Sequence, residues 1–192
     1  SRISQRDLED YRASLTSPLT TSYRGNKIFT PGTLTAGPSI IHALEKLEEI
    51  YSPAGKRPDA EAYIGYADAL FSAYEDRLEN LGEGPDTKFP GNTSHLCVAD
   101  SQGNVVSLTQ TIMSAFGARI HLPTTGFLMN NGMMWFDPRP DGPNSVVGGR
   151  RPLCNMCPTL GRSPDGSWFA VGACGGRKIF PSIFQLIIFL TD

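Results

Sequence analysis

The pattern of hydrophobic and polar positions divides the chain into two regions of different period. Through residue 92 the apolar residues recur at helical spacing, which predicts helices over residues 37–51 and 58–81. An extended stretch over residues 22–29 interrupts this pattern and predicts a short hairpin around Gly25-Asn26. Residues 1–92 are therefore expected to form a mainly helical region.

Each predicted helix carries one apolar face, which predicts burial of that face against a neighbouring element. Pro58 suits the first position of the second helix, and Asp59 and Glu61 complement the dipole of its first turn. The apolar faces comprise Ile40, Ile41, Leu44, Leu47 and Ile50 in the first helix, and Tyr63, Tyr66, Ala67, Leu70, Phe71, Tyr74 and Leu78 in the second.

The period changes to two beyond a polar linker at residues 82–92 that is rich in glycine and proline. Alternation over residues 94–100 and 105–112, with a turn between them, predicts a β-hairpin. An apolar segment at the end of the chain predicts a buried helix, too short for the roughly 20 residues of a bilayer span. Strands in hairpins between helices indicate an α+β fold for the chain, with residues 93–192 as its β-rich part. The further segments are strands over 126–129, 157–162 and 168–173, a turn at 164–166 and the final helix over 179–190.

Composition narrows the function classes without naming one. The 192 residues carry 17 basic and 19 acidic side chains, a net charge of −2, whereas nucleic-acid binding usually leaves a clustered basic surplus. With 40% hydrophobic residues the chain can bury a sizeable core. We expect a globular protein that binds no nucleic acid and does not span a membrane.

The four cysteines predict buried free thiols more than a metal site. Cys154-Asn155-Met156-Cys157 has the C-x-x-C spacing of zinc and redox motifs, but a zinc site needs a second pair or closely spaced histidines. No such second pair is present, and the three histidines stand apart. Unpaired cysteines favour a reducing cytoplasm, with export as the alternative.

Two segments of the sequence contain candidate catalytic groups. The run Gly172–Gly176 closes a strand and opens a helix, where backbone amides can stabilise an oxyanion, although tight packing alone also explains such glycines. The pair Thr93-Ser94 begins a strand after the linker, as ordinary turn residues also do. If the chain were cut before Thr93, its free α-amine, with a pKa of about 7.7–8.0, could take the proton of its own hydroxyl.

Several spaced motifs resemble one known family over nearly the whole chain. They are Tyr23-Arg24-Gly25, Asn92-Thr93-Ser94-His95, Asp100-x-x-Gly103-Asn104-Val105-Val106-Ser107, Thr109-Gln110-Thr111, Phe116-Gly117, Gly126–Asn131, Arg151-Pro152-Leu153, Met156–Thr159 and Gly172–Gly176. In this order they resemble the junction between the large and small subunits of the γ-glutamyltransferases.

The resemblance implies an N-terminal-nucleophile hydrolase fold, an αββα sandwich that would be incomplete in this chain. It implies a precursor that cuts itself between Asn92 and Thr93. Thr93 would then be the nucleophile, Thr111 the hydroxyl hydrogen-bonded to it, and Gly175 and Gly176 the oxyanion-hole residues. Members of the family form a γ-glutamyl ester from amides such as glutathione, need no cofactor, and pass the acyl group to water or to an amino acid.

The chain departs from the family where the γ-glutamyl group is held. The positions that match the asparagine, glutamine and aspartate around the α-ammonium are Met113, Gly132 and Trp135, and a buried ammonium without an acceptor is costly. The serine pair that contacts the α-carboxylate is matched by Cys154 and Asn155, of which only Asn155 is a good donor. An acylase that cleaves a non-glutamyl amide is therefore an alternative.

The resemblance also implies partners and missing parts. The large subunit would extend upstream of residue 1 and supply an arginine for the substrate carboxylate, and the small subunit would continue past Asp192. The expected partners are a small-molecule amide and the rest of the two subunits. A third hypothesis is a non-catalytic scaffold in which Cys154 and Cys157 bind a metal or act in redox chemistry.

Overall fold

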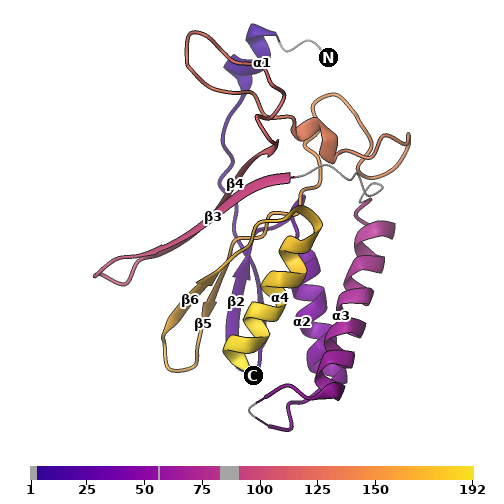
Figure 1. Cartoon of the computed structure of the whole chain (residues 1–192), viewed down its shortest axis with the longest axis vertical. Coiled ribbons are helices and arrows are strands. Elements are labelled where there is room, and N and C mark those ends of the chain that lie inside the picture. The colour runs from indigo at the N-terminus through magenta and orange to yellow at the C-terminus, as the bar shows by residue number, and fades with distance from the viewer. Residues whose placement is uncertain (1–3, 56, 83–90) are drawn as a thin grey trace.

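A four-stranded antiparallel sheet joins the two regions of the sequence (Figure 1). The computed structural model describes residues 4–55, 57–82 and 91–192. The sheet has the order β1-β2-β5-β6, and β2 pairs with β5 through Phe29 and Leu160, so segments from before and after residue 92 share one sheet. Its strands are β1 (Leu19–Tyr23), β2 (Asn26–Thr30), β5 (Thr159–Arg162) and β6 (Trp168–Val171).

The predicted first hairpin is confirmed, with its turn one residue earlier than expected. The turn residues are Arg24 and Gly25, at φ 48° and 76°, and Asn26 already begins β2. A two-residue turn with positive φ at both positions matches the twist of antiparallel strands. Arg24 also ties this turn to the end of the next helix, since its guanidinium donates to the carbonyl of Tyr51.

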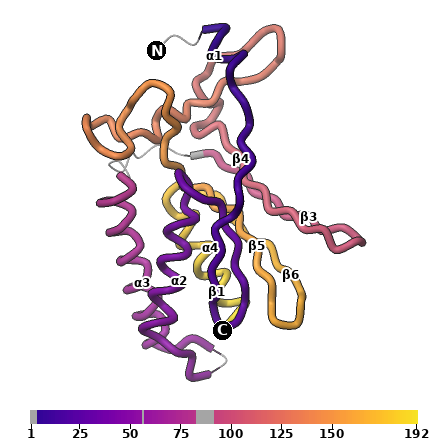
Figure 2. Tube along the Cα trace, turned by 180° about the vertical axis from the view of Figure 1, so that it is seen from behind, coloured from indigo at the N-terminus to yellow at the C-terminus, as the bar shows by residue number. Residues whose placement is uncertain are grey.

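Two helices pack on the sheet, and a third packs against both of them. Helices α2 (Gly37–Ile50) and α4 (Ile179–Thr191) contact the sheet and each other, while α3 (Ala60–Glu79) lies along α2 (Figure 2). A hydrogen bond of 2.8 Å between the His42 ring and the Ser72 hydroxyl joins α2 to α3. The short helix α1 (Gln5–Asp10) buries none of its residues. These positions confirm the predicted helices over 37–51 and 179–190.

The buried face of α3 agrees only in part with the predicted one, since Tyr66 is buried and Leu70 and Tyr74 pack against the core. Tyr63, Phe71 and Leu78, expected inside, are 56%, 69% and 49% exposed. The buried face is instead a stripe of small residues with one tyrosine and one arginine, because small side chains let α3 approach α2 closely. Pro58 precedes the helix, whose N-cap is Asp59. The buried residues of α3 are Ala62, Gly65, Tyr66, Ala69, Ala73 and Arg77.

The predicted second hairpin forms a separate two-stranded sheet. Strands β3 (Gly91–Ala99) and β4 (Val105–Ser114) pair along their length, and the tip of the hairpin projects from the body (Figures 1 and 2). The Ser107 hydroxyl donates to the Val171 carbonyl at 3.1 Å, so the hairpin lies against the end of β6. Helices, four-stranded sheet and hairpin are three of the four layers of an αββα sandwich, and the described residues include no second helical layer.

The segment between β4 and β5 is mostly irregular. The predicted strand over 126–129 was wrong: one isolated bridge joins His121 to Leu128 instead. Gly126 has φ 74° in the turn that this bridge closes, and such a turn interrupts a regular ladder. A short 3-10 helix, η1 (Gly132–Trp135), follows. Residues 83–90 of the predicted linker lie outside the described residues.

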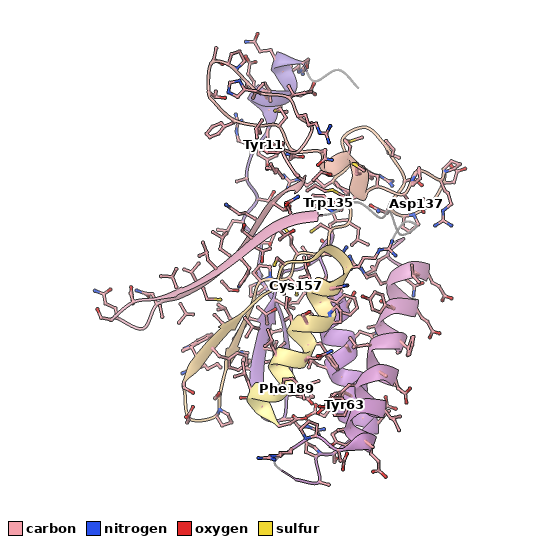
Figure 3. The ribbon with its side chains drawn as sticks, viewed as in Figure 1. Tyr11, Tyr63, Trp135, Asp137, Cys157 and Phe189 are labelled. Atoms are coloured by element: carbon pink, nitrogen blue, oxygen red, sulfur yellow. The ribbon has the colours of Figure 1, made fainter. Side chains whose placement is uncertain are left out.

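The core lies between α2, α3, α4 and the sheet. Six α4 side chains are buried there, and Phe189 at the other side of the helix is 56% exposed (Figure 3). In the described part of the chain, no helix combines the length and the hydropathy that crossing a bilayer requires. The buried α4 residues are Ile179, Phe180, Ile183, Phe184, Ile187 and Ile188.

Truncation of a buried α4 residue should destabilise the protein strongly. Ile183 is fully buried, so Ile183→Ala is expected to lower the free energy of unfolding by about 2–5 kcal/mol, through lost apolar contact and a cavity. Leu190→Ala in the same helix is the control, because Leu190 is 57% exposed. Urea unfolding followed by circular dichroism measures both. Equal losses for the two variants would contradict the assigned orientation of α4.

Candidate active site

The Asn92–Thr93 peptide bond lies inside strand β3, at an irregularity of the hairpin. Asn92 pairs with Met113 and Thr93 with Thr111, so the intervening Ile112 has no partner on β3. Met113 accordingly has φ 76°, an unusual value for a side chain of its size. Such a bulge changes the direction of the neighbouring side chains and interrupts the regular hydrogen bonding between the strands at one peptide unit. The unit affected is the one that the sequence predicts to be cut.

The Thr111 hydroxyl donates one hydrogen bond and accepts another at this bulge. It donates to the Asn92 carbonyl at 2.5 Å and accepts from the Met113 amide at 2.8 Å. The Thr111 hydroxyl therefore donates to the carbonyl oxygen of the Asn92–Thr93 bond, and not to the Thr93 hydroxyl as the resemblance implied. Because Thr93 and Thr111 are directly opposite in the ladder, their Cβ atoms lie on one face, about 5 Å apart. The structure thus brings both predicted threonines together around one carbonyl.

The face of the hairpin that carries Thr93 is the face turned toward β6. Alternation along β3 puts His95 on the same side, and its Nδ1 lies 2.8 Å from the Thr109 hydroxyl. The His95 ring covers Gly172 so closely that a Cβ there would lie 2.0 Å from Cε1. This close approach requires glycine at position 172 and fixes β3 over the end of β6. Burial lowers the pKa of His95 from its ordinary value of 6.5.

The predicted oxyanion-hole residues occupy the junction between β6 and α4. Gly175 and Gly176 have φ 126° and 61°, and a side chain at either position would be strained. Gly176 begins a short 3-10 helix, η2 (Gly176–Lys178), that leads into α4 and contacts β3. The start of α4 and the start of β3 lie close to each other in both views of the fold (Figures 1 and 2). The junction is thus held beside the strand of Thr93.

Met113, Gly132 and Trp135 form one group at the end of β4. Asn131 connects them, since its side chain accepts from the Ser114 amide and donates to the Ser114 hydroxyl, at 2.9 and 2.8 Å. A Cβ at Gly132 would lie 3.1 Å from the Trp135 ring. None of the three side chains carries a carboxylate or an amide oxygen that could accept from an ammonium group. Figure 3 shows Trp135 above the start of α4 and Phe189 near the C-terminal end of that helix.

Cys154 and Asn155 are joined to that group by a residue that the sequence analysis missed. The Asn144 side chain donates to the Trp135 carbonyl and accepts from the Leu153 amide, each at 2.8 Å. Asn144 is buried and therefore needs such partners. It links the 3-10 helix η1 to the segment that carries Cys154 and Asn155. Its position in a proline- and glycine-rich loop gave no periodic signal in the sequence.

A second missed residue, Arg77 of α3, holds the same segment from the other side. Its guanidinium donates to the Cys154 carbonyl at 2.8 Å and to Asn155 Oδ1 at 2.9 Å. The Asn155 amide is thereby oriented, with its oxygen toward Arg77. The sequence does contain a signal, since Arg77 falls four residues after Ala73 on the face that α3 buries.

An open pocket of about 620 Å³ adjoins the Asn92–Thr93 bond. It includes Thr93 and Thr111, the bulged Ile112 and the exposed Phe127. Polar groups thus surround the carbonyl, while the remaining wall is apolar, as in many small-molecule sites. The pocket lining comprises Asn92, Thr93, Ser94, Gln110, Thr111, Ile112 and Phe127.

The cysteines do not form a reactive pair. Cys154 and Cys157 are buried, as predicted, whereas Cys97 and Cys174 are exposed, and all four are free thiols. Burial raises the pKa of Cys154, and raises that of Cys157 to about 11, so both stay protonated at neutral pH. Redox cysteines need the opposite shift. Within the described ranges, no group of three metal-ligating side chains comes together.

Comparisons with known proteins agree on one family. The family model described as gamma-glutamyltranspeptidase matches residues 1–91 and 83–192. The chain is 33% identical to the acylase ACY 1 proenzyme of Pseudomonas sp. strain SE83 and 27% identical to the glutathione hydrolase proenzyme of Escherichia coli K12, with 99% of this chain covered in both. It covers 40% and 41% of those two relatives.

A solved structure shows the fold. The crystal structure of cephalosporin acylase from Bacillus halodurans superimposes with a TM-score of 0.83, at 22% identity, over 99% of this chain and 41% of that one. Together with the family match, this confirms the expected N-terminal-nucleophile hydrolase fold. The chain spans about two fifths of the length of these relatives.

The partly buried His95 should make stability depend on pH. Its pKa is below 6.5 in the folded protein, so the unfolded chain binds more protons between the two values. Stability is therefore expected to be full above about pH 6.5 and to fall as the pH drops below it. Urea unfolding from pH 8 to 5 measures this, with His95→Asn as the control in which the slope is reduced. A His95 pKa at or above 6.5, by NMR titration, would contradict the burial.

Proposed function

Because the chain belongs to the γ-glutamyltranspeptidase family, we propose that Thr93 is the nucleophile of an amide-cleaving enzyme, freed when the precursor cuts its own chain. The observation that carries this proposal is the hydrogen bond from the Thr111 hydroxyl to the Asn92 carbonyl. It supports the proposal because an attack on that carbonyl would develop negative charge on the oxygen that Thr111 contacts.

The self-cleavage step uses groups that are already adjacent. The Thr93 hydroxyl oxygen attacks the Asn92 carbonyl carbon, and the Thr111 hydroxyl stabilises the resulting oxyanion. Collapse breaks the C–N bond, transfers the acyl group to the Thr93 oxygen and protonates the nitrogen. Water then hydrolyses the ester, which leaves a carboxylate on Asn92 and a free α-amine on Thr93.

The freed amine then serves the mature reaction. With a pKa of about 7.7–8.0 it takes the proton of the Thr93 hydroxyl near neutral pH, and the alkoxide attacks the substrate amide. The amine product leaves with the proton, and the acyl group stays as an ester on Thr93 until water or an amino acceptor takes it. The amides of Gly175 and Gly176 are the proposed donors to this second oxyanion. Their placement beside β3 supports that role.

The acyl group preferred by the site is one without an α-ammonium. Met113, Gly132 and Trp135 offer no acceptor for such a cation, and similarity to an acylase proenzyme supports this class. The proposed substrate is an amide of a dicarboxylic acid, with one carboxylate held through Asn155. γ-Glutamyl amides such as glutathione are the second candidate, supported by the similarity to glutathione hydrolase proenzymes. The rest of the two subunits is the proposed partner of this chain.

Removing the Thr111 hydroxyl should slow self-cleavage of the full-length precursor. Thr111→Val keeps the shape and deletes the donor, so the rate is expected to fall roughly a hundredfold, whereas Thr111→Ser should cleave at nearly the normal rate. Denaturing electrophoresis and mass spectrometry follow the fragment that begins at Thr93. Thr93→Ala is the uncleaved control. Cleavage of Thr111→Val at the rate of the parent protein would contradict the role of this hydrogen bond.

Two anilides that differ in one group test the substrate class. Glutaryl p-nitroanilide and γ-glutamyl p-nitroanilide are identical except for the α-ammonium of the second. The cleaved full-length protein is expected to favour the glutaryl compound by at least about tenfold in kcat/KM, because an unpaired buried ammonium is costly. Release of nitroaniline is the readout and Thr93→Ala the blank. Preference for the γ-glutamyl compound would select the second candidate.

A further inference from the structure

Arg77 is buried where neither the hydrophobic core nor the reaction chemistry requires an arginine. Its side chain has no exposed surface, although α3 is otherwise buried through small residues and one tyrosine. Burying a guanidinium is unfavourable unless its donors are satisfied by well-placed acceptors. The acceptors that Arg77 binds therefore indicate its role.

The acceptors of Arg77 come from both sides of the Asn92–Thr93 bond. Upstream, Nη1 donates to the Thr35 carbonyl at 3.2 Å and to the Ser39 hydroxyl at 3.4 Å, both at the start of α2. Downstream, Nη2 donates to the Cys154 carbonyl and to Asn155 Oδ1. The planar guanidinium thus fixes the 154–155 segment relative to the helical layer, through donors in a rigid arrangement.

From this geometry we propose that Arg77 is the positioning residue of the substrate-carboxylate site, acting through Asn155; the inference rests on the proposed function. By binding Oδ1, Arg77 turns the Asn155 amide so that its N–H donors face away from the guanidinium. An asparagine side chain that could rotate would present its oxygen to a carboxylate in one of its two orientations. Arg77 prevents that orientation and presents the donor.

The proposal also gives Arg77 a role after self-cleavage. Once the Asn92–Thr93 bond is cut, α3 and the 154–155 segment belong to separate chains. The bonds from Arg77 to Cys154 and Asn155 then join these chains next to the substrate. Loss of this contact should weaken substrate binding more than it slows the chemical step, since Arg77 holds the 154–155 segment, whereas the proposed chemistry takes place at Thr93.

The test compares kinetics of the cleaved full-length protein with glutaryl p-nitroanilide. Arg77→Lys keeps the charge but loses the planar pair of donors, and KM is expected to rise about tenfold while kcat changes less than about threefold. Arg24→Met is the matched control, because Arg24 bonds the Tyr51 carbonyl and pairs with Asp192, and the KM of this variant should match that of the parent. Asn155→Ala should raise KM as much as Arg77→Lys does.

The double variant decides whether Arg77 acts through Asn155. Arg77→Lys combined with Asn155→Ala should raise KM no more than either single change, because both remove one interaction. Additive effects, an unchanged KM in Arg77→Lys, or loss of cooperative unfolding in Arg77→Lys would each overturn the assignment. If the parent protein cleaves itself but hydrolyses neither anilide, or does not cleave itself, the proposed function fails instead.

Discussion

The pairing of β3 with β4 sets the geometry on which the proposed site depends. The ladder is regular from Ala99 to Thr93 and then shifts by one residue, so that Ile112 bulges and Asn92 faces Met113. This shift lets the Thr111 hydroxyl reach the Asn92 carbonyl while it accepts from the Met113 amide. Without the bulge, the peptide unit before Thr93 would pair with β4 in the regular antiparallel pattern. The hairpin in turn is held in place by the close contact of His95 with Gly172.

The residues proposed to bind substrate come from separate segments and are connected by buried polar side chains. Asn131 ties η1 to the end of β4, Asn144 ties η1 to Leu153, and Arg77 ties the following residues to the helices. A buried donor that lacks its hydrogen bond destabilises the protein. These bonds therefore favour the one arrangement of the loops in which all of them form. In the proposed function, such a site changes its substrate class when the side chains that the framework carries are replaced, and Met113, Gly132 and Trp135 are the proposed replacements.

Sequence reasoning predicted the elements with strong periodicity and the residues with a recognisable motif. Helices α2 and α4 and the β3–β4 hairpin follow directly from their patterns, and Thr93 and Thr111 were identified by the family resemblance. Part of the buried face of α3 was assigned incorrectly because aromatic residues suggest burial, whereas packing against α2 favours small ones such as Gly65. Arg77 and Asn144 were missed because their importance depends on acceptors far away in the sequence. Long-range hydrogen bonds of this kind have no periodic signature.

In the proposed mechanism, Thr93 becomes a free N-terminus and then carries the acyl group. The most direct test of this mechanism is peptide mapping by mass spectrometry of the full-length protein, stopped with acid during turnover of glutaryl p-nitroanilide. We expect a peptide that begins at Thr93 and bears the glutaryl group on that threonine. An intact Asn92–Thr93 bond in a protein that turns over the anilide, or the glutaryl group on any other residue, would contradict it.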